Sequence, residues 1–259
     1  MHRPIGIFDS GIGGTSIWKE IRKKLPFEDT IYLADSKNAP YGTRSEVEIL
    51  ELSKKNTELL LAKDCKLIVV ACNTATTNAI SYLRKNYSVP FIGIEPAIKP
   101  AALQTKTKKV GVLATKGTLS SSLFHSTSRL HAEGIEVIEQ EGKGLVELIE
   151  EGKENTGETE ALLQSYLEPM ILAQVDCLVL GCTHYPYLMP LLKKILPEHV
   201  QIIDSGEAVA RQTKAILEQE NLLTTSTKKG EFKFYSNAEV KVLQSFVQEY
   251  WTSVDYLDF

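Results

Sequence analysis

Short apolar segments alternate with amphipathic segments along most of the chain. The amphipathic segments, such as residues 46–62 and 158–174, have the spacing of helices that bury one face. The short apolar segments are typical of strands that are buried on both faces. These predicted strands comprise residues 5–8, 31–33, 67–71, 91–94, 110–114, 135–138, 178–181 and 200–203.

This order of segments predicts an α/β fold. Continuous apolar strands separated by helices indicate mainly parallel sheets with helices on both faces, which is the doubly wound class. In such sheets, ligands bind beyond the carboxyl ends of the strands. Polar residues that directly follow the predicted strands are therefore the candidates for a functional site.

The chain also repeats itself loosely. Residues 5–11 resemble residues 110–117, since each segment is an apolar strand that runs into a turn with hydroxyl side chains. Residues 67–74 and 178–184 resemble each other as well, since each strand ends on a cysteine. The repeat predicts two pseudo-symmetric doubly wound lobes, with the active site in the cleft between them.

The predicted first lobe contains residues 1–96 and returns at residues 207–259, and the second contains residues 97–206. Residues 97–109 include a proline and a lysine-rich stretch and are predicted to be the linker into the second lobe. The last part of the chain is expected to hold a helix, a polar loop at 221–229, a strand at 231–235 and an amphipathic helix from Glu239.

Two of the four cysteines end predicted strands. The cysteines are Cys65, Cys72, Cys177 and Cys182, and neither their number nor their spacing fits a disulfide framework or a structural zinc site. Cys65 and Cys177 open strands and are expected to be packing residues. Cys72 and Cys182 end strands in the two halves. Two thiols on opposite sides of one carbon can remove a proton from one face and return a proton to the other.

Small polar residues follow both of these cysteines. A helix that begins there would favour the thiolate and lower the pKa of the cysteine. Asn73, Thr74 and Thr183 can bond a substrate carboxylate, and His184 can orient or polarise the thiol of Cys182. A Cys-x-His metal site would need further ligands close by, and none is convincing, so no metal is expected.

A glycine-rich loop at residues 9–14 follows the first strand. A phosphate site fails here, because the third glycine of the dinucleotide fingerprint would fall on Ser16, Asp9 would repel a phosphate, and no Walker-type lysine follows. Instead, Ser10 and backbone amides are expected to receive a carboxylate, while Asp9 faces an ammonium group or tunes a nearby base. An ordinary turn with a helix cap is the alternative.

Two further segments have both a functional and a structural interpretation. The turn at residues 40–45 can place the phenol of Tyr41 and the amide of Gly42 at the mouth of the site. It also fits a helix entry in which Ser45 and Glu48 form a capping box, and the two interpretations are compatible. Glu150 lies on a short predicted helix, where an assisting acid and a solvated helix face are equally compatible with the pattern.

Composition adds exclusions. The 259 residues are 43% hydrophobic and 24% charged with a net charge of −4, which is ordinary for a globular protein and gives no sign of nucleic acid or anionic membrane as a partner. Neither a signal peptide nor an apolar run of transmembrane length is evident. A cytoplasmic protein is expected.

Taken together, these motifs resemble the glutamate racemases of the aspartate/glutamate racemase superfamily. The matching segments are residues 8–14, 40–45, 71–75, 111–118 and 180–186, and the resemblance extends from residue 5 to about residue 206. It implies a cofactor-independent isomerase that interconverts L- and D-glutamate and supplies D-glutamate for peptidoglycan synthesis, and hence for cell wall biogenesis and cell shape. Members of the family often form homodimers, so a homodimer is also implied as an option.

The resemblance also implies roles for individual residues. Cys72 would act on D-glutamate and Cys182 on L-glutamate, assisted by Asp9 and His184. The positions that match substrate contacts are Asp9, Ser10, Tyr41, Gly42, Asn73, Thr74, Thr183 and His184, and Thr115 and Thr118 match further positions of this kind less closely. Glu150 falls where the family often has an assisting acid. Ala114 replaces a common glycine, and residues 141–144 replace a more apolar segment, which leaves the geometry of that loop and the role of Glu150 open.

The chemistry makes demands on such a site. The α-proton of glutamate is very weakly acidic and a thiolate with a pKa of about 8.5 is a poor match for it, so amides and hydroxyls must stabilise the developing dianion. Closure of the lobes would exclude water, and one cysteine must start as a thiolate and the other as a thiol. The alternatives are an aspartate racemase, a cysteine hydrolase with Cys182 as nucleophile and His184 as base, and an amino-acid-binding protein without catalysis.

Overall fold

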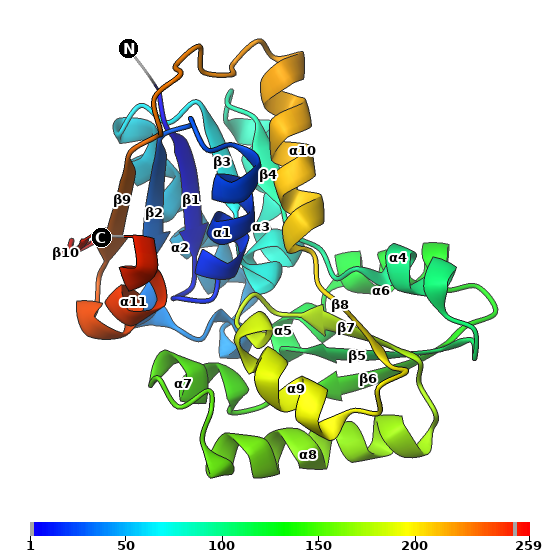
Figure 1. The fold of residues 1–259 in the computed structure, drawn as a ribbon. Coiled ribbons are helices and arrows are strands. Elements are labelled where there is room, and N and C mark those ends of the chain that lie inside the picture. Colours follow the sequence, from blue (N-terminus) through cyan, green and yellow to red (C-terminus); the bar gives the residue numbers. More distant parts are fainter. Residues whose placement is uncertain (1–2, 251–252) are drawn as a thin grey trace.

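Two parallel sheets organise the computed structural model, which describes residues 3–250 and 253–259. Within these residues, the strands form a six-stranded sheet in the order β10-β9-β2-β1-β3-β4 and a four-stranded sheet in the order β6-β5-β7-β8. Figure 1 shows the first sheet standing above the second. The strands that belong to the predicted repeat are β1 (Ile5–Asp9), β2 (Thr30–Ala34), β3 (Leu67–Val70), β4 (Phe91–Gly93), β5 (Lys109–Ala114), β6 (Glu136–Glu141), β7 (Cys177–Gly181) and β8 (Gln201–Ile203).

The repeat in the sequence corresponds to a repeat in topology. In both sheets the first strand of the unit lies between the second and the third, and the fourth strand follows the third. All neighbours in the described sheets pair in parallel. The predicted α/β class with two parallel sheets is thus confirmed.

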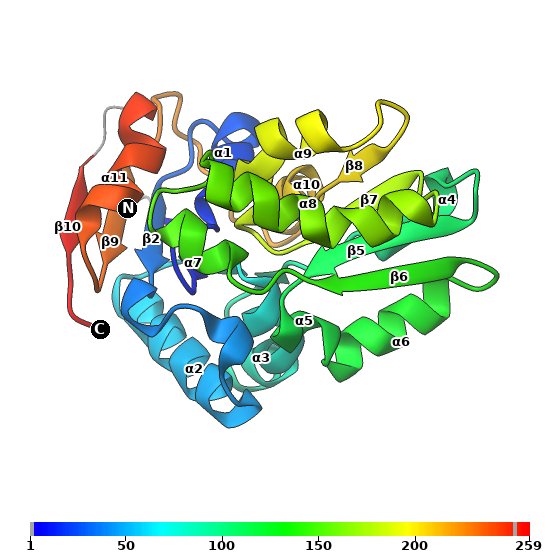
Figure 2. The ribbon, with the colours of Figure 1, turned by 90° about the horizontal axis from the view of Figure 1, so that it is seen from below.

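Helices cover both faces of each sheet, as seen in Figures 1 and 2. Side chains of β1 alternate between faces, so Ile7 packs with the helices of one face and Phe8 with those of the other. The helices of the first sheet are α1 (Thr15–Lys24), α2 (Glu46–Ala62), α3 (Asn73–Asn86), α10 (Gly206–Gln219) and α11 (Val240–Val247). Those around the second are α4 (Ile98–Gln104), α5 (Lys116–Leu119), α6 (Ser122–His131), α7 (Leu145–Glu150), α8 (Gly157–Leu172) and α9 (Met189–Ile195).

Local sequence signals explain most boundaries. Helix α2 begins after Ser45, whose hydroxyl accepts a hydrogen bond from the amide of Glu48 while the Glu48 carboxylate accepts one from the amide of Ser45. The predicted capping box is therefore present. The segment predicted as a linker at residues 97–109 is mostly helix α4, which buries Ile98 and Ala101.

The C-terminal part extends the first sheet. The predicted strand is β9 (Phe232–Ser236), and it pairs with β2. A further strand, β10 (Val254–Tyr256), pairs with β9, and its mostly exposed residues gave no hydrophobic pattern from which to predict it. Helix α10 packs against α1. The division of the chain into lobes at residues 96 and 207 stays a prediction. No helix in the described part of the chain is long and apolar enough to cross a membrane.

Candidate active site

The residues that follow the central strands meet at the edge where the two sheets approach each other. In the first sheet Phe8 is level with Val70, so two residues later Ser10 comes level with Cys72. In the second sheet Ala114 is level with Gly181, which brings Thr115 level with Cys182. Each cysteine that ends a strand therefore has a hydroxyl residue on the neighbouring strand end.

Cys72 is the cap of helix α3 and is only 5% exposed. Its Sγ accepts a hydrogen bond from the Ala75 amide at 3.4 Å and lies 3.8 Å from the hydroxyl oxygen of Ser10. Burial and the nearby charge of Asp9 raise the pKa of Cys72 well above its ordinary value, in spite of the Ala75 amide. The amide at the helix start acts in the expected direction, but burial and Asp9 outweigh it, so the expected low pKa is not reached. A charge on Cys182 raises the pKa of Cys72 further, which indicates that the two sulfur atoms share one environment.

Cys182 is followed by a turn and not by the predicted α-helix. The Tyr185 amide bonds to the Cys182 carbonyl at 3.2 Å, and Pro186 lies in the short 3₁₀ helix η3 (Tyr185–Leu188) that precedes α9. This turn brings Nδ1 of His184 to 3.7 Å from Sγ of Cys182. The thiol thus has a potential cation beside it, unlike Cys72.

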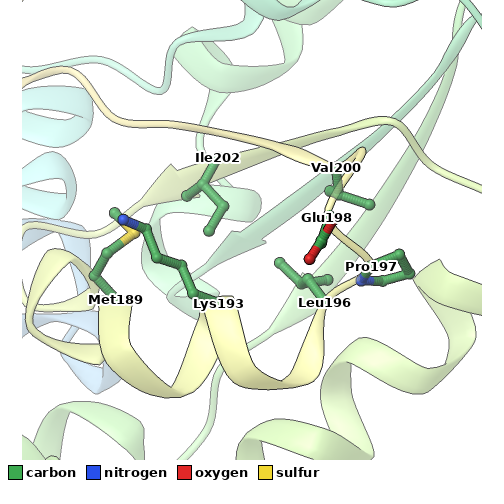
Figure 3. A pocket seen from close by; sticks show the side chains of 7 residues that line it. All are labelled: Met189, Lys193, Leu196, Pro197, Glu198, Val200 and Ile202. Atoms are coloured by element: carbon green, nitrogen blue, oxygen red, sulfur yellow. The ribbon is translucent and has the colours of Figure 1, made fainter.

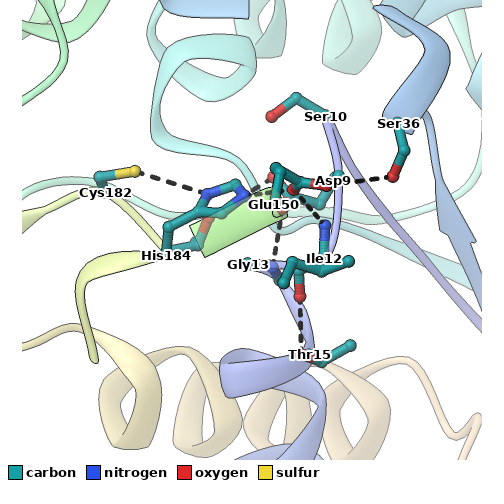
Figure 4. Close-up of polar contacts among 12 residues, drawn as sticks. Asp9, Ser10, Ile12, Gly13, Thr15, Ser36, Glu150, Cys182 and His184 are labelled. Atoms are coloured by element: carbon teal, nitrogen blue, oxygen red, sulfur yellow. Dashed lines mark hydrogen bonds and ion pairs between the residues drawn. The ribbon is translucent and has the colours of Figure 1, made fainter. Parts of the chain in front are cut away.

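A histidine–carboxylate pair supports that cation (Figure 4). Nε2 of His184 lies 2.5 Å from Oε1 of Glu150, the last residue of α7. Burial opposes a charge on His184, but hydrogen bonds to Cys182 and Glu150 and the charges of both raise the pKa of His184 well above its ordinary value. The contacts of His184 therefore favour its cationic form.

Glu150 also joins the second sheet to the first. Its Oε1 accepts a hydrogen bond from the Ile12 amide at 2.7 Å, and the Ser36 hydroxyl donates to Oε2 at 3.4 Å. The side chain is 16% exposed. The alternative of a solvated helix face for Glu150 is therefore wrong.

Asp9, the last residue of β1, is fully buried between these groups. Its Oδ2 accepts a hydrogen bond from the Gly14 amide at 2.7 Å, and the Thr183 hydroxyl lies 3.5 Å from Oδ1. Burial raises the pKa of Asp9 to about 6, although the charge of His184 and the Gly14 amide oppose the shift. Asp9 consequently changes between its neutral and its ionised form at a pH of about 6.

The glycine-rich loop makes room for the pair of Glu150 and His184. A Cβ on Gly11 would lie 1.9 Å from Oε1 of Glu150, and one on Gly13 would lie 2.3 Å from Nδ1 of His184. The loop therefore admits side chains from the other sheet, which agrees with the rejection of a phosphate site.

Hydroxyl groups form a second bridge between the sheets. Oγ1 of Thr74 lies 2.9 Å from Oγ1 of Thr115 and 3.4 Å from Oγ1 of Thr118. Beside them, the Nδ2 group of Asn73 donates to the Ile94 carbonyl at 3.5 Å, and its buried Oδ1 has no hydrogen-bond partner among the described residues. These groups and Ser10 offer donors and acceptors to a small polar molecule.

The phenol of Tyr41 is not exposed at the mouth of the site, so the predicted position is wrong, while a contact between Tyr41 and substrate stays a prediction. It is buried, donates to Oδ2 of Asp35 at 2.5 Å and accepts from Nδ2 of Asn56 at 3.1 Å. Burial and the Asp35 carboxylate raise the pKa of Tyr41 well above its ordinary value, so the phenol remains a donor. A hollow is lined by residues that include Pro40, Gly42, Thr43, Thr115, Lys116, Gly142 and Lys143. We take it as the mouth of the site because Thr115 in its wall bonds to Thr74.

Asp35 and Ser36 were missed in the sequence. Asp35 directly follows β2, so its position at a strand end was the available signal.

Another hollow lies apart from this network, between α9 and β8 (Figure 3), and none of the predicted site residues lines it. In the described part of the chain, no group of three or more histidine, cysteine or acidic residues is placed to hold a metal ion.

Comparisons with known proteins identify the family of this chain. The family model for Asp/Glu/Hydantoin racemase matches residues 6–213. A curated glutamate racemase from Herpetosiphon aurantiacus is 45% identical over 237 residues, which cover 92% of this chain and 93% of that protein. The crystal structure of glutamate racemase isoform RacE1 from Bacillus anthracis has a TM-score of 0.88 and 32% identity, and covers 100% of this chain and 98% of that one.

A crystal structure of the Escherichia coli glutamate racemase, in complex with L-glutamate and the activator UDP-MurNAc-ala, has a TM-score of 0.88 and 34% identity, with 98% of both chains covered. The resemblance to glutamate racemases seen in the motifs is therefore confirmed over nearly the whole length. The chain belongs to the Asp/Glu/Hydantoin racemase family and is an isomerase.

Proposed function

We propose that the protein interconverts L- and D-glutamate without a cofactor, with Cys72 and Cys182 as the two bases. The observation that carries this proposal is the delivery of both cysteines, from matching strand ends of two similar sheets, to one buried polar network. The relatives that are glutamate racemases, among them the Escherichia coli structure with L-glutamate, support the choice of substrate.

The two thiols differ in a way that suits the reaction. Burial raises the pKa of Cys72, which suits the role of proton donor, while the His184 ring beside Cys182 can stabilise a negative sulfur, so we assign Cys182 as the base and Cys72 as the acid when the reaction starts from L-glutamate. The Cys182 thiolate removes the α-proton of L-glutamate, and the Cys72 thiol gives its proton to the opposite face, which yields D-glutamate. After this transfer Cys182 is the thiol and Cys72 is the thiolate, which is the form that starts the reverse reaction from D-glutamate.

The surrounding polar groups bind the substrate and stabilise the intermediate. Ser10, Asn73, Thr74 and Thr183 offer hydrogen bonds to its carboxylates, together with backbone amides such as that of Gly42. Asp9 in its ionised form faces the ammonium group. Since these groups lie in a buried site, their hydrogen bonds act more strongly than they would in water.

The cellular role follows from the product. D-glutamate from this reaction would be consumed in peptidoglycan synthesis, and the enzyme would act in the cytoplasm. A homodimer, which is common in the family, is the proposed oligomeric state. Gel filtration with light scattering would test the oligomeric state.

A circular-dichroism assay of L-glutamate with no added cofactor tests the reaction directly. We expect the optical activity to decay to zero and deuterium from heavy water to appear at the α-carbon. Faster turnover of aspartate would assign the enzyme to the shorter substrate. A trapped acyl-enzyme would favour hydrolysis, and binding of glutamate with no α-proton exchange would leave only a binding protein.

The pKa of Asp9 predicts the acid limb of the activity. Because burial raises this pKa to about 6, Asp9 gains a proton and loses its charge as the pH falls through that value. We expect kcat/KM to fall about tenfold per pH unit below 6. Initial rates between pH 5 and 8 would measure this, and Asp9→Asn should be slower and lack the limb. A wild-type profile that is flat down to pH 5 would contradict the assignment.

Gly13 predicts a steric effect on the site. In Gly13→Ala the new Cβ would collide with the His184 ring, which must move away from Cys182. A displacement of this kind is expected to lower kcat/KM by about 100-fold. The matched control is Gly157→Ala at the start of α8, where a Cβ meets nothing within 4 Å. Equal activity of the two folded variants would refute the steric role of the loop.

A further inference from the structure

One buried acid close to the site takes no part in the proposed proton transfers. Asp35 directly follows β2 and is 2% exposed. Its Oδ2 accepts from the Tyr41 phenol at 2.5 Å, and its Oδ1 accepts from Nδ2 of Asn38 at 2.8 Å and from Nδ2 of Asn237 at 2.5 Å. Because hydrogen bonds to a buried carboxylate are among the stronger ones in proteins, these contacts fix the residues around Asp35.

The segment that Asp35 fixes, residues 36–44, contacts the second sheet at two points. At one end, the Ser36 hydroxyl donates to Glu150. Near the other end, Gly42 approaches Thr115 so closely that a Cβ on Gly42 would lie 2.9 Å from Cβ of Thr115. The segment thus forms one wall of the mouth of the site.

The backbone connects the same residue to the catalytic strand end. The Asp35 amide donates to the carbonyl of Asp9 at 3.0 Å. Asp35 therefore sets the place of the 36–44 segment relative to Asp9 on one side and to Thr115 on the other.

We infer that Asp35 is a positioning residue that holds the 36–44 segment against the substrate-binding mouth. The part of this inference that concerns substrate rests on the proposed function. Cys72 and Cys182 follow other strands, β3 and β7. Glu150 loses the long hydrogen bond from Ser36 when the segment moves, but it keeps the shorter ones to the Ile12 amide and to His184, so the proton-transfer groups stay in place. Loss of the Asp35 contacts consequently weakens substrate binding more than it slows the chemical step.

Asp35→Asn is the variant that tests this. The amide keeps the size of the side chain, but it presents one acceptor oxygen and turns an NH₂ group toward donors. We expect KM for glutamate to rise about tenfold, while kcat stays within about threefold of the wild type. Tyr41→Phe removes a single donor and should raise KM in the same direction by a smaller factor.

Asp176→Asn is a matched control. Asp176 precedes β7 at the end of the strand away from the site, is also buried, and accepts hydrogen bonds from the Thr105 hydroxyl and from the Lys106 and Thr107 amides. Its replacement loosens a loop of the other sheet in the same chemical way. We expect Asp176→Asn to lower the melting temperature without a change in KM. A rise in KM that is seen only in Asp35→Asn therefore distinguishes positioning from a general loss of stability.

Amide hydrogen exchange gives a readout that needs no substrate. Peptides from residues 36–44 should exchange at least several-fold faster in Asp35→Asn and at the wild-type rate in Asp176→Asn. Wild-type exchange and wild-type KM in Asp35→Asn would overturn the inference. If the wild type did not racemise glutamate, the proposed function would fail while the exchange experiment would still decide the positioning role. If Asp35→Asn did not fold, the same measurements on Tyr41→Phe would decide it.

Discussion

Replacement of either Cys72 or Cys182 by alanine is expected to lower the rate of glutamate racemisation by about 10⁴-fold. In the proposed mechanism, each inversion needs one sulfur to remove the α-proton and the other to return a proton on the opposite face. Alanine provides no group that could carry the proton in place of the sulfur, beside Ser10 or beside His184. The circular-dichroism assay measures the loss, and either variant at a near-normal rate would exclude the two-base mechanism.

Each alanine variant keeps one thiol, and that thiol is expected to exchange the α-proton of one enantiomer only. In Cys72→Ala, Cys182 can still remove the α-proton of L-glutamate and return a deuteron from solvent to the same face. Deuterium should therefore enter L-glutamate without inversion in Cys72→Ala, and D-glutamate without inversion in Cys182→Ala. Proton NMR of the α-position in heavy water measures both reactions.

Cys65 and Cys177 provide the matched controls. Both are buried in the cores of their sheets, and burial raises the pKa of Cys65 to about 12 and that of Cys177 to about 11. Their thiols are therefore protonated and unreactive at neutral pH. Cys65→Ala and Cys177→Ala should racemise glutamate at close to the wild-type rate, whatever they lose in stability.

Much of the fold and of the site was predictable because the signals are local. Each apolar strand and the polar residue after it are neighbours in sequence, so the strand ends at Asp9, Cys72, Thr115 and Cys182 could be identified without coordinates. The parallel topology then brings these ends together, since parallel strands place their carboxyl ends at one edge.

Long-range contacts and side-chain directions were not predictable in this way. Glu150 is held by the Ile12 amide, a partner far away in sequence, and no pattern on its own helix reveals that contact. The turn around Tyr41 was located correctly, but the direction of the phenol depends on Asp35, which belongs to a different strand end. The pKa of Cys72 depends on the balance between burial and a helix start, which the sequence alone does not give.

His184→Ala is expected to lower kcat by about 10²- to 10³-fold. The variant removes the cation beside Cys182 and leaves the Glu150 carboxylate without its partner, so the Cys182 thiolate becomes harder to form. L- and D-glutamate have equal free energies in water, so kcat/KM must fall by the same factor in both directions. Unequal losses in the two directions would indicate inactivation during the assay.

The reactivity of Cys182 shows whether His184 acts through this thiol. In a Cys72→Ala background, the pH midpoint for alkylation of Cys182 by iodoacetamide should move upward when His184 is replaced by alanine, because the thiolate has lost its neighbouring cation. His125→Ala, at an exposed position on α6, is the control and should change neither the midpoint nor kcat in the parent enzyme. An unchanged midpoint in His184→Ala would mean that His184 acts on the substrate and not on the sulfur. The ion pair of His184 and Glu150 would then serve to bind a substrate carboxylate, and the Cys182 thiolate would need another source of stabilisation.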